Sequence, residues 1–111
     1  AVRRRSSELS ADILRVGRLS FDFSHREASI DGVVFELPRR ELLVLETLLR
    51  RMGRTVQRSS LEEAVYSMDD EIQSNALDTH VSRLRRKLAD AEAGVAIHAI
   101  RGIGYLLKHA P

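Results

Sequence analysis

Apolar and polar residues alternate with a period of two between residues 14 and 36, a pattern typical of half-buried β-strands. Asp31-Gly32 separates two such runs, and this dipeptide is a strong signal for a tight hairpin turn. The segment is therefore predicted to form a small antiparallel meander. Its alternating apolar positions are Leu14, Val16, Leu19, Phe21, Phe23, Ala28, Ile30, Val33 and Phe35.

From Pro38 the apolar period becomes helical, and Gly53 is where this first helix should end. Proline suits the first turn of a helix and glycine commonly follows the last. The apolar stripe consists of Leu42, Leu45, Leu48, Leu49 and Met52. The charged residues expected on its solvated outer surface are Arg39, Arg40, Glu41, Glu46, Arg50 and Arg51.

A short apolar turn at Thr55-Val56 leads into a second predicted helix, for which Ser59 or Ser60 can provide the N-cap. The apolar positions of this helix are Leu61, Ala64 and Val65. The polar, acidic stretch MDDEIQS at residues 68–74 is predicted to be a loop from its composition.

A third helix is predicted from Ser74 or Asn75, either of which can cap it, with Asp78 in the first turn where the helix dipole favours an anion. At 100° per residue, one narrow apolar stripe contains Leu77, Val81, Leu84 and Leu88. The opposite strip contains Asn75, Thr79, Ser82, Arg83 and Arg86. The flanks carry Asp78 and Arg85 on one side, and His80 and Lys87 on the other.

Two interpretations fit this outward strip of the third helix. It is either the solvated face of an ordinary amphipathic helix or a surface that enters the major groove of DNA. A helix selected only for solvation usually carries glutamates that pair with the cations four residues away. Here no acidic residue occurs between Asp78 and Asp90, so the pattern leaves both interpretations open.

Ala93-Gly94 ends the third helix, and two β-like runs follow at Val95–Ile100 and Tyr105–Leu107. Between them lies Arg101-Gly102-Ile103-Gly104, a thin cationic turn that suits the minor groove or the DNA backbone, or is a plain turn with a solvated arginine. A sheet, three helices and a terminal hairpin predict an α+β winged helix-turn-helix fold.

Composition narrows the possible chemistry. The 111 residues suit one domain, and the absence of cysteine excludes disulfides, thiolate catalysis and cysteine-based zinc sites. The four histidines are scattered, so no metal site and no cofactor are expected. No nucleophile–base spacing or phosphate-binding glycine loop appears, so the chain is not predicted to be an enzyme. The net charge of +2 is too small to indicate nucleic acid by itself.

Three segments together resemble the C-terminal effector domain of OmpR/PhoB-type response regulators. They read LPRRELLVLETLLRRMGRTVQRSSLEEAVY, SNALDTHVSRLRRKL and IHAIRGIGYLL, and the resemblance extends from about residue 14 to residue 108. It implies an N-terminal four-stranded antiparallel sheet, a three-helix core and a C-terminal β-hairpin wing. Leu14–Val16 can supply the fourth strand. Residues 13–110 would then be the winged-helix domain, and residues 1–12 a linker from a missing receiver domain.

The resemblance and the helix face together predict the DNA contacts. The predicted base-reading residues are Arg83, Thr79 and Arg101. The predicted backbone contacts are Arg58, Asn75, His80, Ser82, Arg85, Arg86, Lys87, Gly102 and Tyr105. The acidic loop corresponds to the loop with which the family touches RNA polymerase, and its residues are Met68, Asp69, Asp70, Glu71, Ile72 and Gln73.

The sequence departs from the family pattern at Pro38, Tyr66, Asn75-Ala76, Ser82 and Ala99, which puts the operator sequence in doubt rather than the fold. The resemblance implies sequence-specific binding of double-stranded promoter DNA at tandem half-sites, as a dimer on DNA and in the cytoplasm. It also implies partners, namely RNA polymerase, the chain's own receiver domain and a cognate histidine kinase. The alternative is a winged-helix module that binds proteins without DNA, against which the retained Arg83, Arg86 and Arg101 argue.

Overall fold

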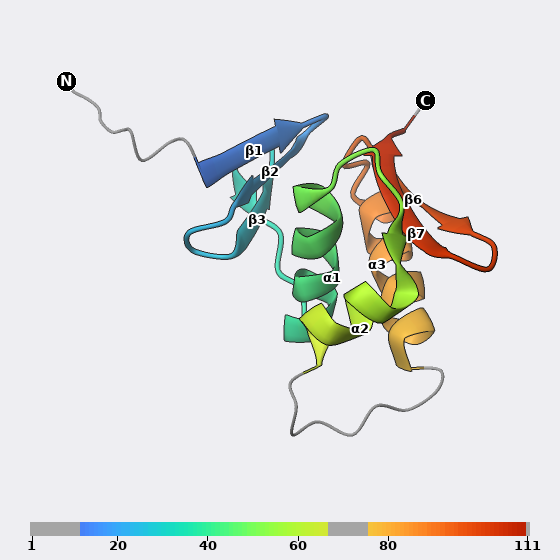
Figure 1. Cartoon of the computed structure of the whole chain (residues 1–111). Coiled ribbons are helices and arrows are strands. Elements are labelled where there is room, and N and C mark those ends of the chain that lie inside the picture. Colours follow the sequence, from blue (N-terminus) through green and yellow to red (C-terminus); the bar gives the residue numbers. More distant parts are fainter. Residues whose placement is uncertain (1–11, 67–75, 111) are drawn as a thin grey trace.

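The computed structural model of the chain describes residues 12–66 and 76–110 (Figure 1). Three helices lie between an N-terminal and a C-terminal sheet, as Figure 1 shows. In chain order the elements are β1 Ile13–Val16, β2 Leu19–Asp22, β3 Glu27–Ile30, β4 Val33–Val34, α1 Arg39–Arg50, β5 Val56–Gln57, α2 Arg58–Val65, α3 Ala76–Asp90, β6 Val95–Ile100 and β7 Gly104–His109. The predicted fold class, including the four-stranded N-terminal sheet, is confirmed.

The N-terminal sheet is an antiparallel meander in the order β1-β2-β3-β4. Asp31 and Gly32 form the two-residue turn between β3 and β4, both with positive φ (52° and 84°), as the Asp-Gly signal predicts. Gly17 opens the equivalent turn between β1 and β2, and a Cβ there would lie 2.8 Å from the carbonyl oxygen of Ala93. The amide of Arg18 donates to that same carbonyl at 2.9 Å, so this turn ties the sheet to the segment after α3.

The hydrophobic core is one cluster to which both sheets and all three helices contribute. The buried apolar residues of α1 are Leu43, Val44, Leu45, Leu48 and Leu49. The buried face of α1 is thus broader than the predicted stripe, and Leu42 and Met52 are only partly buried. The helix α1 packs against α2, α3 and β7 on different sides, which explains the difference.

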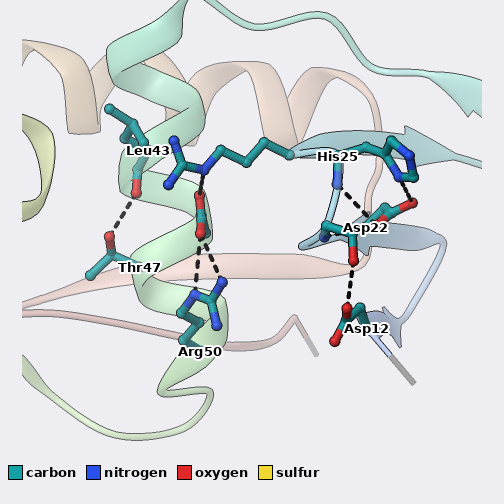
Figure 2. A network of polar contacts seen from close by, with 9 residues as sticks. Asp12, Asp22, His25, Leu43, Thr47 and Arg50 are labelled. Carbon is teal, nitrogen blue, oxygen red and sulfur yellow. Dashed lines mark hydrogen bonds and ion pairs between the residues drawn. The ribbon is translucent and has the colours of Figure 1, made fainter. Parts of the chain in front are cut away.

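Glu41 and Glu46 on α1 are buried, at 2% and 6% exposed, so the prediction that they belong to a solvated surface is wrong. The Glu46 carboxylate is 3.2 Å from the guanidinium of Arg26, which follows β2, and 3.0 Å from that of Arg50 on the next turn of α1. Figure 2 shows Arg50 within this network of polar contacts. Glu41 faces α3 and accepts a hydrogen bond from Lys87 at 2.8 Å. Partners from elsewhere in the fold make the burial of both carboxylates possible.

The segment expected as an apolar turn before α2 is the strand β5, which pairs antiparallel with β7 through Val56↔Tyr105 and Gln57↔Gly104. The C-terminal sheet therefore has the order β5-β7-β6, where a two-stranded hairpin was predicted. Because β5 runs directly into α2, the helix starts at Arg58 and its N-cap is Gln57 without a side-chain cap bond. Ser59 and Ser60 lie in the first turn, so neither provides the predicted cap.

Candidate nucleic-acid interface

The two faces of α3 differ as its sequence predicts. The inward residues Leu77, Val81, Leu84 and Leu88 are each at most 1% exposed. The outward side chains, all exposed and polar or cationic, are Thr79, Ser82, Arg83, Arg85 and Arg86. The apolar stripe anchors the helix in the core, so these side chains project from a rigid element.

His80 lies at the flank of this face, half-buried, with its ring centroid 6.2 Å from that of Tyr66. Burial is the main cause that lowers the pKa of His80 below its usual value, and the charge of Arg40 lowers it further, while Glu41 raises it and Arg83 lowers it by smaller amounts. The imidazole is therefore neutral at pH 7 and offers a hydrogen bond rather than a charge to a neighbouring phosphate.

Lys87 lies on the same flank and is already paired within the protein. Its ammonium donates to the buried carboxylate of Glu41 at 2.8 Å, while its own side chain is 39% exposed. A phosphate would have to compete with this carboxylate for the ammonium group. Lys87 is thus a weaker candidate for a backbone contact than the exposed Arg86.

The wing consists of β6 and β7, which pair from Val95↔His109 to Ile100↔Gly104. At its tip Arg101, Gly102 and Ile103 are all exposed, Gly102 has a φ of +77°, and the amide of Ile103 closes the turn on the carbonyl of Ile100 at 2.9 Å. Ile103, at 53% exposed, adds an exposed apolar side chain to the tip of the wing, which the sequence analysis did not identify as a contact.

The base of the wing is fixed to β5 and α2. A Cβ at Gly104 would lie 2.0 Å from the carbonyl oxygen of Val56, so no other residue fits this close crossing of the strands. The amide of Arg58 donates to the carbonyl of Ile103 at 3.0 Å. The wing therefore has a set position relative to the start of α2.

Asp78, in the first turn of α3, joins this start of α2 to the wing. Its carboxylate lies 2.5 Å from the guanidinium of Arg58 and accepts a hydrogen bond from the Tyr105 hydroxyl. These bonds, that of Arg58 first, hold the pKa of Asp78 below its usual value, while burial and then the bond to Asp78 raise the pKa of Tyr105. Sequence reasoning assigned Asp78 only to the helix dipole and missed this role. Nothing in its local sequence signals the two partners.

The outward face of α3 and the tip of the wing are both exposed, and the bonds of Asp78 to Arg58 and Tyr105 join the first turn of α3 to α2 and the wing. Of the predicted contacts, Arg83, Arg86 and Arg101 are exposed, whereas Asn75 and the acidic loop at residues 68–73 lie outside the described residues. In the part of the chain that the structure describes, no group of three or more acidic or histidine side chains could hold a metal ion. No described helix is long and apolar enough to cross a membrane.

Comparison with known proteins agrees with this geometry. The family described as "Transcriptional regulatory protein, C terminal" matches residues 32–107. A probable transcriptional regulatory protein of Sinorhizobium fredii, y4xI, is 44% identical over 108 residues, which are 97% of this chain and 48% of that protein. The chain therefore spans about half the length of this curated relative.

Solved structures show the same architecture. The DNA-binding domain of CpxR from E. coli is 33% identical with a TM-score of 0.72, covering 89% of this chain and 98% of that one. The DNA-binding domain of RstA from Klebsiella pneumoniae, solved in complex with the RstA box, is 25% identical with a TM-score of 0.70, covering 86% and 96%. The chain belongs to the family of C-terminal domains of transcriptional regulatory proteins, the OmpR/PhoB-type winged-helix domains.

Proposed function

We propose that the chain binds double-stranded promoter DNA sequence-specifically, as the output domain of a response regulator. The observation that carries this proposal is the outward face of α3, where exposed Ser82, Arg83 and Arg86 stand opposite a fully buried apolar stripe. A helix with this division has the width and chemistry to lie in the major groove, its arginines directed at base edges and phosphates.

Within this proposal Arg83 reads bases in the major groove, with Thr79 beside it, and Arg101 enters the minor groove from the wing. Phosphate contacts come from side chains around them and position the domain without carrying sequence information. These contacts are His80, Ser82, Arg85, Arg86 and Gly102, with Asn75 at the start of the helix. Arg58, Lys87 and Tyr105 contribute less, because each already binds a carboxylate within the protein.

The relatives' greater length supports a wider proposal for the whole protein. We expect an upstream receiver domain, joined by a linker at residues 1–12 and phosphorylated by a cognate histidine kinase in the cytoplasm. Receiver dimerisation would place two winged-helix domains on tandem half-sites. The acidic loop at residues 68–73 would then contact RNA polymerase.

The central experiment is selection of bound sites from a random duplex pool, read by sequencing. We expect one enriched motif, repeated at about one helical turn if two domains bind side by side. A pool without enrichment would contradict the proposal and favour a winged helix that binds proteins only.

Two arginine variants then test the assignment of roles on α3. Arg83→Ala should lose about 1–3 kcal/mol on the enriched duplex and far less on a random duplex. Arg86→Ala, the matched control on the same face, should weaken both and flatten the slope of log affinity against log salt by about one unit. Equal losses of Arg83→Ala on both duplexes would show that Arg83 contacts phosphate.

A further inference from the structure

Three side chains from three elements meet at the carboxylate of Asp78. Arg58 is the first residue of α2, Asp78 lies in the first turn of α3, and Tyr105 is the second residue of β7. Arg58 and Asp78 are 2.5 Å apart with side chains 37% and 47% exposed, and the Tyr105 hydroxyl donates to the same carboxylate oxygen. The network therefore lies at the surface, between the outward face of α3 and the wing.

This network lies between the outward face of α3 and the tip of the wing, the two parts of the proposed DNA-binding surface. Asp78 precedes Arg83 by five residues, which is about 7–8 Å along a helix axis. Tyr105 follows Arg101 by four residues, across the tip of the wing. A hollow of about 410 Å³ between the wing and α3 is lined by Arg58, Asp78 and Tyr105 together with the tip residues.

Among the described residues, the backbone hydrogen bonds near the tip of the wing go to β5 and α2 rather than to α3. Gly104 pairs with β5, and the amide of Arg58 holds the carbonyl of Ile103, so these contacts fix the wing to β5 and α2. The base of the wing packs on α3 within the core through β6, and the bond from the Tyr105 hydroxyl to Asp78 adds a polar contact between the wing and the first turn of α3. Asp78 also holds Arg58, so one carboxylate joins all three elements.

The negative charge of Asp78 is unexpected on a surface proposed to bind phosphates. A carboxylate on a surface that faces phosphates opposes binding by simple repulsion, so a residue with no other role would weaken the interaction. The carboxylate of Asp78 instead accepts hydrogen bonds from Arg58 and Tyr105. Charge-assisted hydrogen bonds of this kind are stronger than neutral ones.

We propose that Asp78 is a positioning residue for DNA binding, which fixes the wing relative to α3 so that Arg83 and Arg101 engage one site at a set separation. This inference rests on the proposed function, and it adds a residue that itself need not touch DNA. Repulsion and positioning predict opposite effects when the charge is removed.

The test uses Asp78→Asn, which keeps the size of the side chain but removes the charge. On the duplex enriched from the random pool we expect about tenfold weaker binding, the scale of one lost charge-assisted bond. The matched control is Asp90→Asn, the same charge change at the exposed far end of α3, which should bind within about twofold of wild type. Tighter binding of Asp78→Asn, with a steeper dependence on salt, would show a merely repelling carboxylate and overturn the proposal.

A double-mutant cycle with Arg101→Ala separates positioning from general weakening. If Asp78 acts through the wing, the loss caused by Arg101→Ala should be at least about threefold smaller in the Asp78→Asn background than in wild type. Tyr105→Phe, which removes the hydroxyl and keeps the ring, should reproduce this coupling and serves if Asp78→Asn folds poorly. Strictly additive losses for both variants would overturn the proposal.

Amide hydrogen exchange of the free protein gives a readout that needs no DNA. We expect faster exchange at residues 100–105 in Asp78→Asn, with exchange in the core of α3 unchanged. Unchanged exchange in the wing would overturn the positioning role even if DNA binding falls. If wild type enriches no duplex, the proposed function fails, while the exchange experiment still decides whether Asp78 fixes the wing.

Discussion

Lys87→Met should destabilise the protein, because Lys87 is the partner of a buried carboxylate. Its ammonium lies 2.8 Å from Glu41, which is only 2% exposed. The methionine keeps an unbranched apolar side chain along the surface of α3, so packing is largely retained. The main loss is the charge that balances Glu41.

The burial of the two partners sets the expected magnitude. Removing one partner of a fully buried ion pair typically costs about 3–5 kcal/mol, because the other charge stays uncompensated. Lys87 is 39% exposed, so water reaches its side of the pair and reduces the cost to about 2–3 kcal/mol. In a domain of this size that corresponds to a fall in Tm of roughly 10–20 °C.

The assay is urea unfolding followed by circular dichroism, with Lys108→Met as the matched control. Lys108 is an exposed lysine on β7, so its replacement should change the free energy of unfolding by less than about 0.5 kcal/mol. The double variant Glu41→Met/Lys87→Met should recover most of the stability, since an apolar pair often replaces a buried ion pair without loss.

The reasoning would be refuted if Lys87→Met were as stable as the Lys108 control, or if the two substitutions in the double variant simply added. DNA binding gives a second check. Lys87→Met should change the slope of log affinity against log salt less than Arg86→Ala does. A full unit of change would restore Lys87 as a principal phosphate contact.

Three further predictions concern the wing and the titrating groups. Gly104→Ala should lower the free energy of unfolding in urea by more than about 3 kcal/mol, because the added Cβ would lie 2.0 Å from the Val56 carbonyl oxygen. Gly102→Ala should cost only about 1–2 kcal/mol, because Gly102 has a positive φ but no atom lies within 4 Å of the added Cβ. NMR titration should give His80 a pKa below the ordinary value of about 6.5. Because the folded pKa is lowered, the contribution of His80 to stability is present above pH 6.5 and is lost as pH falls through the folded pKa. The folded pKa of Asp78 is also lowered, so the stability difference between wild type and Asp78→Asn should be full at pH 7 and shrink as pH falls below about 4.

Several features of the fold could be predicted because their causes are local. The Asp31-Gly32 turn needs two positive φ angles, which this dipeptide adopts at low cost. The stripe from Leu77 to Leu88 follows from the helical period, and all four of its leucine and valine residues are buried. The same period predicts Arg83 and Arg86 on the outward face of α3, and both are exposed.

By itself, therefore, the sequence determined the order of the three helices, the Asp31-Gly32 turn and the inner and outer faces of α3, but not the strand β5. The tertiary structure decided which charged residues form ion pairs or hydrogen bonds with other side chains of the protein. Lys87 and Glu41 are 46 residues apart, Tyr105 and Asp78 are 27 apart, and Arg58 and Asp78 are 20 apart. Periodicity extends over a few turns and carries no information about such distant partners. Only the packing of α1, α2 and the wing against α3 brings these charges together, and it leaves Arg83, Arg86 and Arg101 exposed.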